Sequence, residues 1–201
     1  MKSGDLAVLI LAAGSSSRLG QPKQLLPFKK TTLLEHTISC AQSVSDNVFV
    51  ILGGNHSIIQ NKIDLQGIEV ILTQDWHKGI GSSISSGVKS ITKTIQDTES
   101  IMILLCDQPK ITNELLVELV AIHAEMKKPI SACKYGNSFG VPAIFNKNMY
   151  KELEKLKDDS GAKVMIGKNK NYASFLNFPD GNIDIDNQED LKYLEGSQNI
   201  E

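Results

Sequence analysis

Residues Ala7–Phe28 read AVLILAAGSSSRLGQPKQLLPF, and this stretch decides the fold class. It begins with a continuous apolar run, Ala7–Leu11, which has the length and composition of a buried β-strand. A loop of glycine and serine follows and places Arg18 and Lys23 before a second apolar segment. A strand that is apolar at every position is typical of a parallel sheet with helices on both faces.

The rest of the chain repeats this alternation of apolar strands and amphipathic helices. Further strands are expected at Val48–Leu52, Ile68–Leu72, Ile101–Leu105 and Val141–Phe145. Helical spacing predicts helices over Leu33–Ala41, Ser57–Ile63, Ser82–Ile95 and Glu114–Met126. The pattern predicts a Rossmann-like three-layer α/β sandwich with a mostly parallel sheet. Beyond these elements we expect a helix over Asn146–Leu156, a turn at Asp158–Gly161, a strand near Ala173–Phe178 and a short helix from Gln188.

Length and composition limit the class of protein. A chain of 201 residues is expected to form one domain over residues 1–195, with a flexible tail at residues 196–201. The net charge of −2 argues against a large basic surface for nucleic acid. No apolar run is long enough to span a bilayer, and Met1–Asp5 lacks the features of a secretory signal. We therefore expect a cytoplasmic protein that binds neither nucleic acid nor membrane. Its three cysteines are expected to be reduced core thiols: Cys40, Cys106 and Cys133.

The loop after the first strand carries groups that suit a triphosphate. It is neither a Rossmann fingerprint nor a Walker loop, because the glycine spacing is wrong for both. Its small residues would let backbone N–H groups approach a phosphate closely. Arg18 offers a planar fork and Lys23 a point charge. The alternative is a solvated turn with incidental cations.

Carboxylates follow two other segments. Asp107 ends the strand in LLCDQP, and Thr112 is better placed than Asp107 to cap the next helix. Such a carboxylate, facing a triphosphate, suits Mg²⁺. In NIDIDN, an extended backbone would put Asp184 and Asp186 on one face and turn the isoleucines inward. The alternative is that Asp186 only starts the helix at Gln188.

The motif L-A-A-G-x-S-x-R-x-G-x-x-K-x-L-L-P resembles the signature of nucleotidyltransferases that build activated sugars and pterins. More narrowly, the chain resembles the molybdenum cofactor cytidylyltransferases. Further motifs follow in the family's order: DWHKGIGSSISSG, LLCDQP, GVPAIF with DDSGAK, and NIDIDNQEDL. Together they span Leu11 to Leu191. The resemblance implies a nucleotide-diphospho-sugar transferase type of fold, with a nucleotide-binding half over about residues 1–110 and an acceptor half over about 111–195.

The resemblance also implies an activity: transfer of CMP from CTP to the phosphate of molybdenum-loaded molybdopterin, with release of pyrophosphate. The implied catalytic residues are Arg18, Lys23 and Asp107, and Asp107 and Asp186 would hold Mg²⁺ or Mn²⁺. Asp184 is the less certain of the two carboxylates in NIDIDN. The implied nucleotide-binding residues are Leu11, Ala12, Ala13, Gly14, Ser15, Arg18, Lys23, Gly79, Ser82 and Ser83. Ordinary helix capping by Ser82 explains the same motif nearly as well, and His77 is expected to be a surface residue.

The acceptor site resembles the family less closely. The implied acceptor-binding residues are Gly140, Pro142, Asp159, Gly161 and Lys163. Val141 stands where a histidine is usual, and Lys163 stands where an arginine is usual, which is not a conservative change at a bidentate site. Alternatives are therefore another phosphorylated acceptor, such as a sugar or polyol phosphate, or a non-catalytic cofactor carrier.

Base preference depends on Ala13. The related guanylyltransferases resemble LAGG where this chain has Leu11-Ala12-Ala13-Gly14. The extra Cβ favours a pyrimidine, hence CTP, over the GTP of a guanylyltransferase. The resemblance further suggests a monomer that contacts a molybdoenzyme client or its chaperone transiently.

Overall fold

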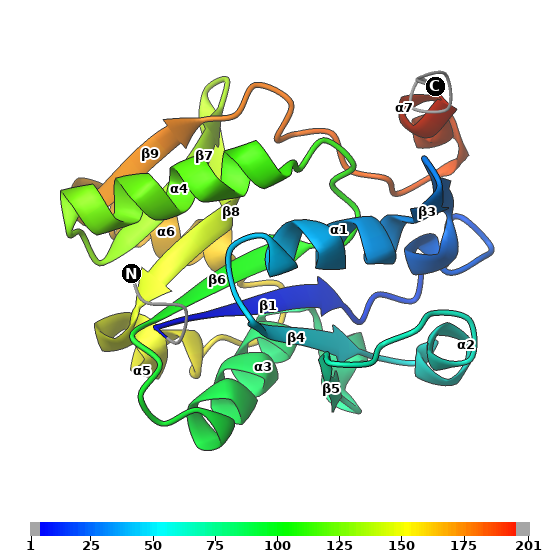
Figure 1. Ribbon diagram of the computed structural model, residues 1–201, viewed down its shortest axis with the longest axis horizontal. Coiled ribbons are helices and arrows are strands. Elements are labelled where there is room, and N and C mark those ends of the chain that lie inside the picture. Colours follow the sequence, from blue (N-terminus) through cyan, green and yellow to red (C-terminus); the bar gives the residue numbers. More distant parts are fainter. Residues whose placement is uncertain (1–4, 196–201) are drawn as a thin grey trace.

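The computed structural model describes residues 5–195, which form a central sheet covered by helices (Figure 1). The seven-stranded sheet has the order β5-β4-β1-β6-β8-β7-β9, and β2 and β3 form a separate two-stranded ribbon. The strand bounds are β1 Leu6–Ala12, β2 Pro27–Phe28, β3 Thr31–Thr32, β4 Asn47–Leu52, β5 Glu69–Leu72, β6 Ser100–Leu105, β7 Ile130–Tyr135, β8 Ser138–Asn146 and β9 Ala173–Asn177. Every residue of β1 is buried, as its continuous apolar sequence predicts.

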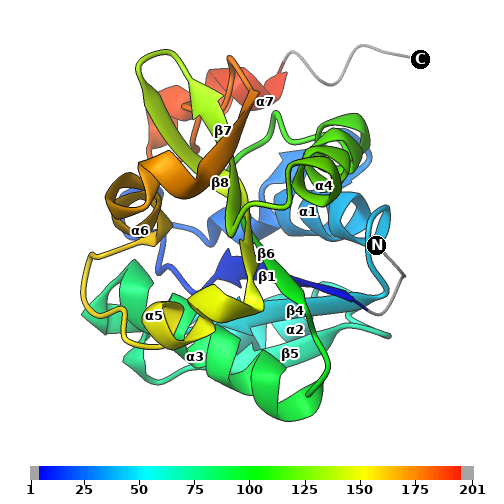
Figure 2. The ribbon, with the colours of Figure 1, turned by 90° about the vertical axis from the view of Figure 1, so that its left-hand side faces the viewer.

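Helices cover both faces of the sheet (Figure 2). One face packs against α1 and α4, and the other packs against α3, α5 and α6. The α-helices are α1 Leu33–Gln42, α2 His56–Gln60, α3 Ile80–Thr94, α4 Asn113–Met126, α5 Tyr150–Leu153, α6 Ala162–Lys168 and α7 Lys192–Glu195. Short 3₁₀ helices are η1 Lys23–Leu25, η2 Asp75–Lys78, η3 Lys147–Met149, η4 Lys170–Tyr172 and η5 Gln188–Leu191. The predicted three-layer α/β sandwich is therefore confirmed.

The sheet is parallel around β1 and mixed around β8. Strands β4 and β6 both run parallel to β1, and β5 runs parallel to β4. Strand β8, predicted as Val141–Phe145, is longer than expected and antiparallel to both β6 and β7. Strand β7 was not predicted, because its residues ISACKY include a buried serine and lack a continuous apolar run. The helix predicted over Asn146–Leu156 is only η3 followed by the four-residue α5.

The structure bears on the expectations for the cysteines, for membrane-spanning helices and for the end of the chain. The three cysteines are free and buried, as predicted. No helix within residues 5–195 is long and apolar enough to cross a membrane. The tail expected to fray, residues 196–201, lies outside the described residues.

Candidate active site at the carboxyl ends of β1 and β6

The connection order of the sheet reverses between β1 and β6. Chain segments leave β1 toward β4 on one side and return to β6 on the other, and Leu11 pairs with Leu105 at the end of both strands. Such a switch point opens a crevice at the carboxyl ends of the strands. A pocket of about 180 Å³ lies there, lined by Leu11, Ala12, Ala13, Gly14, Lys23, Gln24, Trp76, Gly79, Ile80, Ser83, Leu105, Cys106 and Asp107.

Most of the predicted nucleotide-binding residues line this pocket, but three do not. Arg18 and Ser15 are exposed on the loop outside the lining residues, and Ser82 is half-buried beside it. His77 is exposed, as expected. The structure therefore gathers the backbone of residues 11–14 with Lys23, Gly79, Ser83 and Asp107, and leaves Arg18 at the rim.

The loop after β1 is held in place by Gln24. This side chain is fully buried, and its Nε2 donates to the carbonyl of Ala12 at 2.6 Å and to that of Gly14 at 3.2 Å. Ser16 adopts a left-handed conformation (φ +55°), and its Oγ accepts from the backbone N–H of Lys23 at 3.0 Å. Sequence reasoning missed Gln24, because nothing in its type separates it from the exposed Gln21 nearby.

Lys23 is the electrostatic centre of the site. Its Nζ lies 2.5 Å from Asp107 Oδ2 and 2.8 Å from Asp186 Oδ1, and it also donates to the carbonyl of Ile185 at 3.2 Å. Burial would lower the pKa of Lys23, but the neighbouring carboxylates outweigh that effect and raise the pKa above its usual value. Lys23 is therefore a fixed cation at the edge of the pocket.

The segment that carries Asp184 and Asp186 is anchored by Ile185. The side chain of Ile185 is fully buried, and the backbone N–H of Ile185 donates to the backbone carbonyl of Asp107 at 2.9 Å. Asn187 caps η5 with its own side chain, so Asp186 does not start that helix. Thr112 caps α4 through Leu115 N–H, which likewise leaves Asp107 free of a capping role.

Two carboxylate oxygens of this cluster are buried without a hydrogen-bond partner: Asp107 Oδ1 and Asp184 Oδ1. Burial, together with the charges of Asp107 and Asp186, raises the pKa of Asp184 to about 6. Unsatisfied buried carboxylate oxygens are costly, and such oxygens are the ligands that hard divalent cations prefer. The donor set therefore fits a divalent cation. Within residues 5–195 no cluster of three or more acidic, histidine or cysteine side chains is disposed for a metal.

The start of α3 is capped by another part of the chain. The helix begins at Ile80, so Ser82 lies inside its first turn, and the interpretation of Ser82 as its cap is wrong. Instead, Gly81 N–H donates to the carbonyl of Asp158 at 2.8 Å. A Cβ on Gly81 would come within 2.7 Å of Lys157 O, and a Cβ on Gly79 within 2.8 Å of Asp159 Oδ1. The loop of residues 157–160 thus packs directly on Gly81 and on Gly79, which lines the 180 Å³ pocket.

A second pocket, of about 590 Å³, is lined by one residue of the carboxylate cluster, Asp184. It is lined by Tyr135, Gly136, Asn137, Ser138, Lys163, Pro179, Gly181, Asn182 and Asp184. Of the predicted acceptor-binding residues only Lys163 lines it. Gly140 and Pro142 are buried in β8, Gly161 caps α6, and Asp159 lies beside Gly79. Tyr135 was not predicted, and its ring is packed against Gly181 and Gly140.

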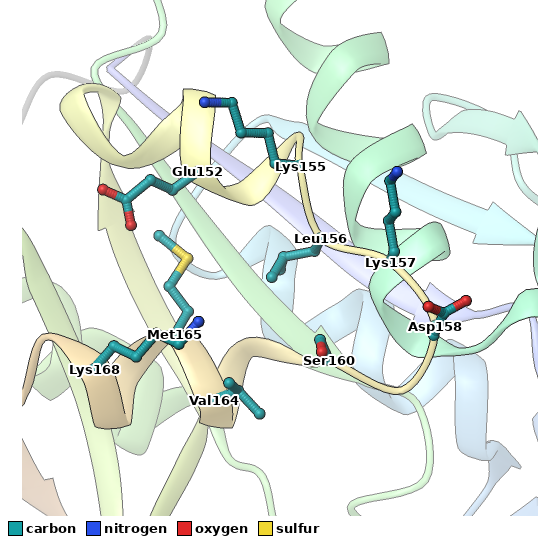
Figure 3. A pocket seen from close by; sticks show the side chains of 9 residues that line it. All are labelled: Glu152, Lys155, Leu156, Lys157, Asp158, Ser160, Val164, Met165 and Lys168. Carbon is teal, nitrogen blue, oxygen red and sulfur yellow. The ribbon is translucent and has the colours of Figure 1, made fainter.

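A third pocket, of about 340 Å³, lies between α5 and α6 on the outer side of the 157–160 loop (Figure 3). Leu156 and Met165 point into the gap between the two helices, while Lys155 and Lys157 project away from it (Figure 3). It contains none of the residues of the Lys23 cluster, so we assign the chemistry to the crevice at β1 and β6.

Comparison with known proteins identifies the class. Residues 8–172 match the MobA-like NTP transferase domain, and the chain belongs to this family of nucleotidyltransferases. The chain is 30% identical over 179 residues to the purine catabolism protein PucB of Bacillus subtilis, covering 83% of this chain and 82% of that protein. It is 32% identical over 117 residues to a probable molybdenum cofactor guanylyltransferase of Bacillus mycoides, covering 57% and 54%.

Solved structures agree with this assignment. Rv0371c from Mycobacterium tuberculosis superposes with a TM-score of 0.84 at 27% identity, covering 98% of this chain and 100% of that one. A complex of Rv0371c with manganese superposes with a TM-score of 0.79 at 25% identity, covering 96% and 99%. The predicted fold and enzyme class are confirmed, whereas the molybdenum cofactor relative carries the name of a guanylyltransferase rather than a cytidylyltransferase.

Proposed function

We propose that this protein transfers CMP from CTP to the phosphate of a molybdenum-loaded molybdopterin and releases pyrophosphate. One observation carries the proposal: the carboxylate cluster around Lys23 reaches two pockets, because Lys23 and Asp107 line the pocket at the small-residue loop and Asp184 lines the pocket that contains Lys163. A group transfer needs a donor site and an acceptor site that share one charged centre. The nucleotide would occupy the pocket lined by the first half of the chain, and the acceptor the pocket lined by Lys163.

The loop after β1 would bind the phosphates of the nucleotide. Gln24 fixes the carbonyls of Ala12 and Gly14, so the backbone is organised before the nucleotide arrives. Lys23 would neutralise charge that grows on the α-phosphate. Arg18, exposed at the rim, would turn its fork toward the departing pyrophosphate.

Asp107 and Asp186 would hold Mg²⁺ or Mn²⁺, with the unpartnered oxygen of Asp184 close by. When bound, such a cation would neutralise phosphate charge, and Asp107 and Asp186 would be its protein ligands. The manganese complex of Rv0371c supports a divalent cation for this protein too.

The chemistry asks little covalent help of the protein. An acceptor phosphate oxygen forms the new bond to the α-phosphorus, the bond to the β-phosphate oxygen breaks, and pyrophosphate leaves with the electron pair. The acceptor monoester is largely ionised at pH 7, so no general base is required. The task of Lys23, Asp107 and the loop is to position and neutralise.

Ala13 supports the choice of CTP. It lines the pocket, and its Cβ takes space that a larger purine would need. GTP is the second candidate, because the molybdenum cofactor relative is named as a guanylyltransferase. In an Ala13→Gly variant, kcat/KM for CTP divided by kcat/KM for GTP should fall. An unchanged ratio would show that Ala13 does not determine the choice of base.

The acceptor is tested by pyrophosphate release. Purified protein with CTP and Mg²⁺ is offered molybdopterin cofactor, a sugar phosphate or a polyol phosphate. Turnover with the pterin alone supports the proposal, whereas turnover with a sugar or polyol phosphate alone replaces the acceptor. Nucleotide binding without release from any acceptor would favour a cofactor carrier. We further propose that the protein acts as a cytoplasmic monomer that hands its product to a client by transient contact.

A further inference from the structure

Trp76 lies in η2, between β5 and α3, and it is the only tryptophan of the chain. It is half-buried, and it lines the 180 Å³ pocket together with Ala13, Gly79 and Ile80. Neither the loop chemistry nor the carboxylate cluster uses it. Its position on the pocket wall therefore calls for its own explanation.

The backbone after β4 packs directly against the indole. A Cβ on Gly54 would come within 2.8 Å of Trp76 Cζ2 and 3.1 Å of Cε2, and a Cβ on Gly53 within 2.7 Å of Cγ. Both positions therefore need glycine so that the chain can lie against the ring. The imidazole of His77 stands edge-on to the same ring, with centroids 6.0 Å apart and an interplanar angle of 88°. These contacts fix the orientation of the indole.

We propose that Trp76 is the stacking platform for the nucleobase of the substrate; this rests on the proposed function, in which the pocket receives a nucleotide. A ring that backbone supports on one side and that borders a pocket is pre-organised to receive a flat aromatic ligand, since little side-chain freedom is lost on binding. The ligand class is a nucleobase carried on a phosphate chain, because the phosphate-binding loop and Lys23 lie in the same pocket.

Stacking is tolerant of base identity, because every base has a π-face. Trp76 thus supplies affinity for the base, whereas Ala13 supplies the choice between bases. The two residues line the same pocket, and the carbonyl of Ala13 adjoins Gly53, which in turn contacts the indole. The loop after β1 and the platform are therefore packed as one unit.

The test combines the fluorescence of the single tryptophan with calorimetry. Wild type, Trp76→Phe and Trp76→Ala are titrated with CTP and with tripolyphosphate, which has no base, in the presence of Mg²⁺. Tyr172→Ala, an exposed aromatic outside the site, is the matched control. We expect CTP to change the emission of Trp76 and Trp76→Ala to bind CTP roughly 5- to 100-fold more weakly. Trp76→Phe should stay within about threefold of wild type, since it keeps a ring. Tripolyphosphate affinity should be equal in all four proteins.

Three results would overturn the proposal. One is CTP binding, seen by calorimetry in the wild type, that leaves the emission unchanged. Another is equal CTP affinity in wild type and Trp76→Ala. If Trp76→Ala does not fold, the proposal is tested by the change in wild-type emission on binding CTP and by the CTP affinity of Trp76→Phe. The third is a folded wild type that binds neither CTP nor GTP, which would remove the proposed function as well, whereas the first two leave the proposed function intact.

Discussion

Lys23 Nζ lies 2.5 Å from Asp107 Oδ2, and the same nitrogen lies 2.8 Å from Asp186 Oδ1. With the bond to the carbonyl of Ile185, all three donors of the ammonium group are engaged. Lys23 therefore neutralises the carboxylates that would hold the metal. The phosphates of a nucleotide offer new hydrogen-bond acceptors to the ammonium group of Lys23. Lys23 can then release the carboxylates of Asp107 and Asp186.

This arrangement predicts that a free divalent cation binds weakly without nucleotide. Lys23→Met removes the competing charge, so we expect it to bind Mn²⁺ at least about tenfold more tightly than wild type in the absence of nucleotide. Titration followed by electron paramagnetic resonance of free Mn²⁺ measures this directly. The exposed Lys30→Met is the matched control and should behave as wild type. Weaker or unchanged Mn²⁺ binding by Lys23→Met would contradict the account.

Asp107→Asn tests the other half of the pair. Losing one contact to the transferring group should lower kcat about 10²–10³-fold, since the amide neither holds the cation nor balances Lys23. The same variant should unfold at a temperature close to that of wild type, so that loss of activity is not loss of fold. Asp97→Asn, at an exposed position, is the control. Near-normal turnover by Asp107→Asn would remove Asp107 from the catalytic centre.

Much of this centre could be predicted from the sequence, because its positions follow from continuous apolar strands. The loop with Lys23 follows the apolar run Ala7–Leu11, and Asp107 ends another apolar strand. Lys23 and Asp107 could therefore be placed at one edge of a parallel sheet. The roles of Gln24 and Trp76 could not be predicted in this way. Each depends on contacts with backbone carbonyls or glycines that only the folded chain brings near.

The acceptor side was harder to predict for the same reason. Strand β7 has a mixed sequence and is defined by its pairing with β8 and β9. Likewise, Gly79 and Gly81 pack against the loop of residues 157–160, which lies far along the chain. Local pattern carries no signal for such a contact.

The packing of that loop on Gly79 gives a stability prediction. Gly79 (φ +104°) and Gly67 (φ +78°) both have left-handed backbones, but only Gly79 has the 157–160 loop where a Cβ would lie. Gly67→Ala should therefore cost only the backbone strain, about 1 kcal/mol of the free energy of unfolding. Gly79→Ala should cost a further ~1–3 kcal/mol, because the loop must move. Urea unfolding of the two variants measures the difference, and equal costs would show that the loop contact contributes nothing.

A buried histidine predicts how stability depends on pH. His123 lies between Ser100 Oγ, 3.2 Å from Nε2, and Ser131 Oγ, 2.9 Å from Nδ1. Burial lowers its pKa, so the unfolded chain binds more protons than the folded one below the ordinary histidine pKa of about 6.5. The contribution of His123 to the free energy of unfolding should therefore fall as the pH drops from 7.5 to 5.5, whereas Asp184, whose pKa is raised to about 6, contributes in the opposite direction.

His123→Gln should remove this contribution and leave those of Asp184 and of His36, whose pKa burial also lowers. Urea unfolding of both proteins at the two pH values supplies the comparison. Gln60→Ala, which changes an exposed side chain that does not titrate, is the control and should keep the wild-type dependence of stability on pH. The same dependence of stability on pH in wild type and His123→Gln would contradict the assignment of a neutral, buried His123.

The central claim is that this site moves a nucleotidyl group, and label transfer tests it most directly. Molybdopterin cofactor and Mg²⁺ are incubated with CTP or GTP labelled at the α-phosphate, with wild type or Asp107→Asn. We expect label on the pterin from CTP, a much lower yield from GTP, and transfer about 10²–10³-fold slower with Asp107→Asn. Transfer of label that is equally fast with Asp107→Asn, or no transfer from either nucleotide to any phosphorylated acceptor, would contradict it.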